Sequence, residues 1–309
     1  MTKENENIIF KAMLKIYEVL NGYNNAALSI SGGADSDIML DLILRTVDKY
    51  NIDIKLYFVF VDTGLEYKAT KEHIKYLENR YNIKIDIIKP VLSIPLSVKK
   101  YGVPFVSKRV SDYISRLQKY NFDFNTDSFE VNYKKYPHCK AALRWYTNNF
   151  GGRYDIKYNK MLREFLIDHA IPKVSKKCCD ISKKEPLNRY HKENNIELSI
   201  QGLRRFEKGG RENIKSCWNT KENKFYPVLW FTDSTKEEYE HYYNITHSKC
   251  YMVYGLKRTG CVGCPFSMNY EKELNIVLKH EPQLYKACIN VFKNAYEIKA
   301  LYNNYKKGV

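Results

Sequence analysis

The stretch that decides the fold reads Leu28-Ser29-Ile30-Ser31-Gly32-Gly33-Ala34-Asp35-Ser36-Asp37. The apolar run at 26–30 is typical of a buried strand, and from Ser36 onward apolar residues recur at helical spacing. Between them, glycines without Cβ atoms let backbone N–H groups approach an anion closely. That anion would also lie at a helix N-terminus, where the helix dipole favours negative charge. The stretch therefore predicts a strand, an anion-binding turn and a helix; a glycine-rich turn without a ligand is the alternative.

The pattern Ser-Gly-Gly-x-Asp-Ser at 31–36 resembles the PP-loop of the ATP pyrophosphatase superfamily, whose members bind ATP or another adenylyl nucleotide there. A P-loop is excluded because the turn contains no lysine. The resemblance implies a bound nucleotide accompanied by Mg²⁺, with Asp35 also a candidate catalytic residue. The candidate nucleotide-binding residues of this stretch are Ser29, Ser31, Gly32, Gly33, Asp35 and Ser36.

Strands and helices alternate after this stretch. A second apolar strand at 55–61 ends at Asp62-Thr63-Gly64, and a helix at 67–81 and a strand at 85–88 follow. This order predicts an α/β fold with a doubly wound, mostly parallel sheet, and the resemblance implies one like the adenine nucleotide alpha hydrolases. Ligands bind such sheets at the carboxyl ends of the strands. Asp62, Thr63 and Gly64 are therefore candidates to lie near the adenosine, with a helix N-cap as the alternative for Asp62.

The sequence predicts three parts. Residues 1–103 form the N-terminal part of the nucleotide-binding domain, 104–171 a helical insertion or cap, and 172–309 the remainder of the sheet, a cysteine-rich site and C-terminal helices. The N-terminus is polar and no apolar run approaches the ~20 residues of a membrane span, so we expect a cytoplasmic protein without a membrane partner.

The net charge of +16 indicates a polyanionic partner such as a nucleic acid, or a generally lysine-rich composition. Basic residues concentrate after the first strand–helix–strand unit. We expect one basic face, continuous with the nucleotide cleft, from Lys108, Arg109, Lys134, Lys135, Lys140, Arg144, Lys183 and Lys184.

Eight unevenly spaced cysteines favour metal or redox chemistry over disulfides. Cys178 and Cys179 are adjacent, and Cys261 and Cys264 form a C-x-x-C pair about 80 residues later. Four thiolates suit Zn²⁺ or an iron–sulfur cluster, and their softness alone does not choose between the two. Two unrelated cysteine pairs are the alternative reading. Further candidate ligands, should adjacent cysteines not both reach one centre, are Cys217 and Cys250.

The cysteine pattern resembles the 4Fe–4S signature of adenylylsulfate (APS) reductases, relatives of phosphoadenylylsulfate (PAPS) reductases. The segment 200–207 with Arg211 is similar to that family's Gly-x-Arg-x-x-Glu segment and its following arginine. The resemblance implies a 4Fe–4S cluster on Cys178, Cys179, Cys261 and Cys264, and a nucleotide contact at Gly202. It also implies that phosphate or sulfate oxygens are clamped by catalytic guanidinium groups, here those of Arg204, Arg205 and Arg211. A solvated basic loop is the alternative.

Two departures from the reductases bear on the reaction. The reductases attack sulfur with a cysteine in a C-terminal Glu-Cys-Gly segment, whereas this sequence ends Lys-Lys-Gly-Val and Cys288 is expected in the core of a helix. A glutamate expected after residues 62–64 is also missing, and Ala69-Thr70 stands there. A basic, cluster-bearing relative without that cysteine resembles the enzymes of DNA phosphorothioation.

The first hypothesis is a PP-loop enzyme of the PAPS reductase family. It would split ATP between the α and β phosphates and adenylylate an acceptor, a nucleic acid, for sulfur insertion. The alternatives are a thiol-dependent APS or PAPS reductase that makes sulfite, and an iron–sulfur redox-sensing regulator that binds a nucleotide or nucleic acid. A sulfur-donor protein is a further expected partner, and the oligomeric state stays open.

Overall fold

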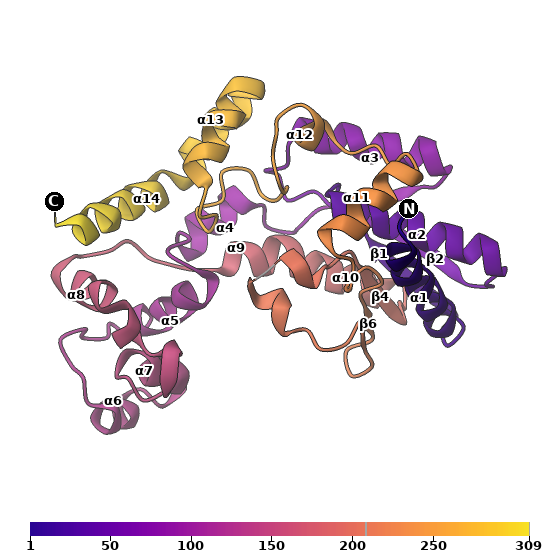
Figure 1. Cartoon of the computed structure of the whole chain (residues 1–309). Coiled ribbons are helices and arrows are strands. Elements are labelled where there is room, and N and C mark those ends of the chain that lie inside the picture. Colours follow the sequence, from indigo (N-terminus) through magenta and orange to yellow (C-terminus); the bar gives the residue numbers. More distant parts are fainter. Residues whose placement is uncertain (208, 309) are drawn as a thin grey trace. The chain divides into compact units, whose positions relative to one another are not determined.

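A computed structural model describes residues 1–207 and 209–308 of the chain (Figure 1). The chain divides into two compact units. The sheet unit comprises Met1–Pro90 and Lys184–Gly260, and the helical unit comprises Val91–Lys183 and Cys261–Val309. The boundaries predicted from the sequence, after residues 103 and 171, both fall inside the helical unit. Within the described residues, no helix is long and apolar enough to cross a lipid bilayer.

The sheet unit contains one six-stranded sheet with the order β3-β2-β1-β4-β6-β5. All neighbouring strands are parallel except β5 and β6, which confirms the predicted mostly parallel sheet. Register places Ala27 of the first strand opposite Tyr57 on one side and Ser199 on the other. The strands are β1 (Asn25–Ser29), β2 (Lys55–Val61), β3 (Ile85–Ile88), β4 (Leu198–Gln201), β5 (Trp218–Asn219) and β6 (Lys224–Phe225).

The order in which the chain adds strands to the sheet reverses between β1 and β4. From β1 the chain adds β2 and then β3 on one side, and later returns to add β4 on the other side of β1. The turns that follow β1 and β4, at 31–33 and 202–204, therefore lie together at the topological switch point. In open α/β sheets this is where ligands bind.

Helices cover both faces of this sheet. Helices α1, α2 and α11 pack against one another beside the strands (Figure 1). The apolar residues Leu28, Ile38 and Phe60 are fully or almost fully buried in the core on that side. From the opposite face, Tyr57 contacts Tyr190 of α10, because successive side chains of a strand point to opposite faces. The helices are α1 (Lys3–Leu20), α2 (Ala34–Tyr50), α3 (Lys68–Tyr81), α10 (Glu185–Glu193), α11 (Asp233–Tyr242) and α12 (Lys249–Met252).

The helical unit is held together by a second apolar core. Phe105, Trp145 and Phe165 of the middle segment are buried together with Ile298 and Tyr302 of the C-terminal helix α14. This shared burial joins segments that are far apart in the sequence. The α-helices are α4 (Ile94–Tyr101), α5 (Lys108–Gln118), α6 (Phe129–Lys135), α7 (Lys140–Tyr146), α8 (Lys160–Asp168), α9 (Lys177–Cys179), α13 (Tyr270–His280) and α14 (Pro282–Lys307).

Candidate functional site

The turn after β1 is closed by its own serines. Ser36 Oγ donates to the carbonyl of Gly33 at 2.8 Å and accepts from the backbone N–H of Ser31 at 3.2 Å. Gly32 has φ +66°, and a Cβ there would lie 2.7 Å from a methyl group of Thr70. Gly33 is the N-cap of α2 and makes no side-chain capping bond. The geometry therefore combines a fixed turn with a 17-residue helix whose N-terminus has no side-chain cap, which suits an anion.

The turn that follows β4 lies against the first turn of α2. A Cβ on Gly202 would lie 2.7 Å from the carbonyl oxygen of Asp35 and 2.8 Å from the Cα of Ser36. Both of these atoms belong to backbone, which cannot move aside cheaply. Glycine is therefore required at 202 for the two turns of the switch point to meet.

A cavity of about 170 Å³ opens at this meeting point. Its lining carries five basic side chains and two acidic ones, an excess of positive charge that suits phosphate groups. The lining residues come from the turn after β1, the loop after β4, α11 and the segment around α12. They are Ser31, Gly33, Ala34, Asp35, Ser36, Gly202, Arg204, Glu207, Arg211, Lys236, Tyr251, Lys257, Arg258 and Thr259.

Arg204 is a buried link within the site. Its Nε donates to Asp35 Oδ1 at 2.8 Å and its Nη1 donates to Asp233 Oδ1 at 2.9 Å. Only 7% of the residue is exposed. Arg204 thus connects the first turn of α2 to the first turn of α11. It fixes the position of the cavity wall and also contributes a positive charge to it.

The other two candidate arginines differ in orientation. Arg211 lines the cavity and pairs with Glu207. Burial and the nearby positive charge of Arg258 lower the pKa of Arg211, which shows how closely cations gather here. Arg205 lies outside the lining of the cavity. Its Nε donates to the carbonyl of Glu212 at 3.0 Å, and its guanidinium carbon lies 5.6 Å from the ring centroid of Trp230. The structure brings Arg204 and Arg211 into the cavity but not Arg205.

The residues at the end of β2 lie outside the cavity lining. Asp62 accepts from the backbone N–H of Gly64 at 3.1 Å and from Lys71 Nζ at 2.7 Å. The N-cap of α3 is Tyr67, so the capping role considered for Asp62 is not found. At the end of β1, the buried Oγ of Ser29 has no hydrogen-bond partner among the residues described. Contacts of Ser29, Gly32 and residues 62–64 with a nucleotide stay predictions.

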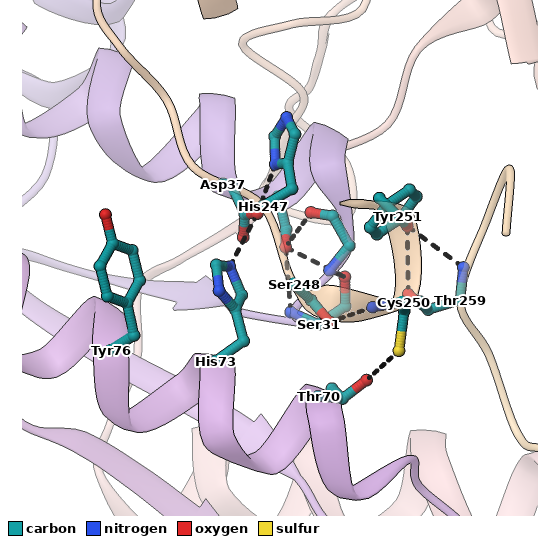
Figure 2. Close-up of polar contacts among 12 residues, drawn as sticks. Ser31, Asp37, Thr70, His73, Tyr76, His247, Ser248, Cys250, Tyr251 and Thr259 are labelled. Atoms are coloured by element: carbon teal, nitrogen blue, oxygen red, sulfur yellow. Dashed lines mark hydrogen bonds and ion pairs between the residues drawn. The ribbon is translucent and has the colours of Figure 1, made fainter. Parts of the chain in front are cut away.

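Several cavity residues were not predicted from the sequence. They come from α11 and from the chain around α12. In the latter segment, Tyr251 Oη lies 3.2 Å from Thr259 Oγ1 (Figure 2). A Cβ on Gly33 would approach both hydroxyls within 3.3 Å, so this segment lies directly against the turn after β1. The one sequence signal was the basic pair Lys257-Arg258 before Cys261.

A buried polar network lies behind the loop. Asp37 is fully buried, and its Oδ2 contacts His73 Nε2 at 2.9 Å and His247 Nδ1 at 2.8 Å (Figure 2). His247 Nε2 in turn contacts Glu240 Oε1 at 2.7 Å. Burial lowers the pKa of His247, but hydrogen bonds to Asp37 and Glu240 outweigh it and raise that pKa to about 9. His247 is therefore held as a cation between two carboxylates.

The four predicted cysteine ligands all belong to the helical unit. The thiol of Cys178 donates a hydrogen bond to the sulfur of Cys179, and this contact, together with burial, raises the pKa of Cys178. Cys264 and Cys261 act on it in the same direction, so the four sulfurs lie close enough to interact. Within the described residues, no group of three or more His, Cys, Asp or Glu side chains has the geometry of a metal site, and no cysteine is in a disulfide.

The C-x-x-C turn is fastened to α14. Tyr296 Oη donates to the carbonyl of Gly263 at 2.5 Å, and Lys299 Nζ donates to that of Pro265 at 2.6 Å. The thiol of Cys288, which is fully buried as expected, donates to the carbonyl of Val262 at 3.3 Å. Gly263 has φ +62°, and a Cβ there would lie 2.7 Å from Tyr296 Oη. Cys217 and Cys250 belong instead to the sheet unit.

Comparison with known proteins identifies relatives by sequence. The family model described as the phosphoadenosine phosphosulfate reductase domain matches residues 25–136 and 146–267. The uncharacterized protein MJ0973 of Methanocaldococcus jannaschii is 23% identical over 288 residues, which cover 90% of this chain and 50% of that protein. The uncharacterized protein MJ0066 of the same organism is 32% identical over 123 residues, which cover 38% of this chain and 24% of that protein. The chain thus spans about half the length of the first of these relatives and a quarter of the second.

Three solved structures resemble the chain at low identity. A PAPS reductase from Candida auris in complex with phosphate is 16% identical with a TM-score of 0.41, over 84% of this chain and 96% of that one. The U34-tRNA thiolase NcsA of Methanococcus maripaludis, with its [4Fe-4S] cluster, is 14% identical with a TM-score of 0.40, over 95% and 80%. An NH3-dependent NAD synthetase from Campylobacter jejuni is 13% identical with a TM-score of 0.40, over 98% and 96%.

Proposed function

The chain belongs to the phosphoadenosine phosphosulfate reductase domain family, and from this premise we propose that it binds ATP at the PP-loop cavity and adenylylates a nucleic-acid acceptor. The observation that carries the proposal is the cavity itself. It lies at the switch point, at a helix N-terminus without a side-chain cap, and is lined by five basic side chains. Both the anion affinity of helix N-termini and the position at the switch point favour a nucleotide phosphate there.

In the proposed reaction, an acceptor oxygen attacks the α-phosphorus of ATP. A bond forms between them, the bond from the α-phosphorus to the oxygen bridging the β-phosphate breaks, and pyrophosphate leaves with that electron pair. Negative charge increases on the leaving group, and in this proposal it is stabilised by the cavity-lining residues Arg211, Lys257 and Arg258. Arg204 holds the wall in place through Asp35, which is the candidate carboxylate for the Mg²⁺ that accompanies ATP.

A sulfite-forming reductase is the alternative reaction. In the reductases a cysteine thiol attacks sulfur, so such a thiol must be accessible to the substrate. Cys288 is fully buried and its thiol is bonded to the carbonyl of Val262, which disfavours it in that role.

We extend the proposal to a 4Fe–4S cluster on Cys178, Cys179, Cys261 and Cys264. The residue types suit such a cluster, because cysteine thiolates are its ligands and Cys179, Cys264 and Cys261 all act electrostatically on Cys178. Lys108 and Lys183 act electrostatically on Cys179 and would offset the charge of the thiolates. When bound, the cluster would supply electron transfer or sulfur ligation. Zn²⁺ is the alternative occupant of four thiolates.

The test of ATP binding uses two exposed lysines of the same unit. Lys257 lines the cavity, whereas Lys221 lies outside the lining. Isothermal titration with ATP should show an affinity at least about tenfold lower for Lys257→Gln, because a hydrogen bond to a charged group contributes about 1.5–3 kcal/mol. The Lys221→Gln control should bind like the wild type. Equal affinities in both variants would place ATP elsewhere.

The reaction is tested by its products. Release of pyrophosphate from ATP, stimulated by added nucleic acid, is the expected result. Release of sulfite from APS or PAPS in the presence of a thiol reductant would instead identify a reductase. ATP binding with neither product, under reducing and oxidising conditions alike, would favour the redox-sensing regulator.

A further inference from the structure

The helical unit contains a cavity much larger than the nucleotide site. Its volume is about 880 Å³, within the range of about 300–1,000 Å³ typical of ligand sites. Its walls are the end of α4, one side of α5 with the loop that follows, and the chain leading into Cys178. The lining residues are Tyr101, Asp112, Ser115, Arg116, Gln118, Lys119, Asn121, Phe122, Phe124, Lys173, Ser175, Lys176 and Lys177.

The walls of this cavity are fixed to one another. The side chain of Gln118 donates to the carbonyl of Pro172 at 3.0 Å and accepts from the backbone N–H of Val174 at 2.9 Å. Val174 also forms a β-bridge with Val103, and a Cβ on Gly102 would lie 2.2 Å from the carbonyl oxygen of Lys173. The segment that leads into the cysteine pair is thereby tied to α5. The cavity is thus built into the unit rather than left between unconnected segments.

The charge around this cavity is unbalanced. Its lining has five basic side chains and a single carboxylate, that of Asp112. Asp112 is already shared, because Arg116 Nη2 lies 3.1 Å and Lys176 Nζ 3.5 Å from its oxygens. Lys119, Lys173 and Lys177 make no ion pair in the part of the chain that the structure describes. Gathering cations around one cavity costs free energy, which a bound polyanion would offset.

The cavity also carries aromatic side chains. Phe122 and Phe124 meet edge to face with ring centroids 5.5 Å apart, and Lys177 Nζ lies 4.5 Å from the ring centroid of Tyr101. Aromatic rings on which bases stack, next to cations that neutralise phosphates, are what single-stranded nucleic acids bind. A simple inorganic anion would need neither the rings nor the volume.

We propose that this cavity binds a segment of single-stranded nucleic acid, with a base among the aromatic rings and the backbone phosphates on Lys119, Lys173 and Arg116. The proposal rests on the proposed function, since it assigns the site of the acceptor. Lys176 and Lys177 of its wall directly precede Cys178 in the chain. The bound strand would therefore run past the cysteine pair. None of the eight basic residues that the sequence singled out is in the lining of this cavity.

The test measures binding of a fluorescently labelled 12-nucleotide strand, as RNA and as DNA, to the full chain by anisotropy. The test variant carries Lys119→Glu with Lys173→Glu. The matched control carries Lys272→Glu with Lys286→Glu, two exposed lysines of the same unit outside the lining. We expect an affinity more than tenfold lower in the test variant and less than threefold lower in the control. The slope of log K against log[salt] should become shallower by about 1.4, because each single-strand phosphate contact contributes about 0.7.

A Tyr101→Leu variant tests the stacking separately, since it removes a ring without changing charge. We expect it to bind the strand at least fivefold more weakly at every salt concentration. The proposal is overturned if the control loses as much affinity as the test variant, if AMP competes as strongly as the oligonucleotide, or if the wild type binds no single strand. ATP titrations of the same variants should match the wild type. A wild-type protein that does not bind ATP would instead count against the proposed function alone.

Discussion

His247 offers a quantitative test of the network behind the PP-loop. Its ring bridges Asp37 Oδ2 and Glu240 Oε1, and His73 and Lys236 contact the same two carboxylates. Replacing His247 by glutamine keeps a polar side chain but removes the positive charge between two carboxylates. We therefore expect His247→Gln to destabilise the sheet unit and to do so in a pH-dependent way.

The magnitude follows from the pKa of His247. Although burial opposes the charged form, the two hydrogen-bonded carboxylates raise that pKa from 6.5 to about 9. One pKa unit corresponds to about 1.4 kcal/mol, so the protonated ring contributes about 3 kcal/mol to folding. Because the folded state holds the proton more tightly, this contribution is complete below pH 6.5. It declines as the pH rises and is lost above pH 9.

The assay is urea unfolding at pH 6 and pH 9.5, followed by tryptophan fluorescence, to which Trp218 and Trp230 of the sheet unit contribute together with Trp145 of the helical unit. The free energy of unfolding should differ between wild type and His247→Gln by about 3 kcal/mol more at pH 6 than at pH 9.5. His241→Gln, an exposed histidine of α11 next to Glu240 in the sequence, is the matched control and should show no such difference. A wild-type-to-variant difference that is equal at the two pH values would refute the reasoning.

Three further predictions concern the nucleotide and cluster sites. Gly202→Ala should abolish ATP binding in calorimetry and lower the melting temperature, because its Cβ would meet the backbone of Asp35 at 2.7 Å; an unchanged melting temperature would contradict this close approach. Gly33→Asp should lose ATP affinity while its far-ultraviolet circular dichroism stays that of the wild type, since its carboxylate would occupy the anion site; full ATP affinity would remove the PP-loop assignment. Anaerobically purified wild type should carry about four irons per chain, and Cys264→Ser should carry fewer while Cys217→Ser keeps them. Stoichiometric zinc without iron in the wild type would reject the cluster.

Local sequence patterns were sufficient to predict much of the secondary structure of the sheet unit. The apolar runs at 26–30, 55–61 and 85–88 correspond to β1, β2 and β3, and the helical spacing from Ser36 corresponds to α2. These elements follow from side-chain periodicity over a few residues, which the chain carries in itself. The glycine at 32 was equally readable, because a positive φ is a local demand of the turn. The close approach of Tyr251 and Thr259 to Gly33 is not local and could not be read from the turn.

The tertiary structure alone decided which polar side chains meet. Arg204 and Arg205 are adjacent in the sequence, yet only Arg204 reaches the cavity, because its partners Asp35 and Asp233 lie on two other helices. His247 is distant in sequence from Asp37, and nothing in its local pattern indicates that the two side chains are in contact.

Packing also decided which segments of the chain make up the helical unit. The sequence separated a middle insertion from the C-terminal helices, but Phe105 and Phe165 share one core with Ile298 and Tyr302. The sequence by itself determined the strands β1, β2 and β3, the glycine turn that follows β1 and the spacing of the cysteine pairs, because periodicity, glycine and spacing act over short distances. Only the tertiary structure decided the cavity walls, the carboxylate–histidine network and the grouping of distant helices, because these depend on apolar burial and charge pairing between segments far apart in the chain.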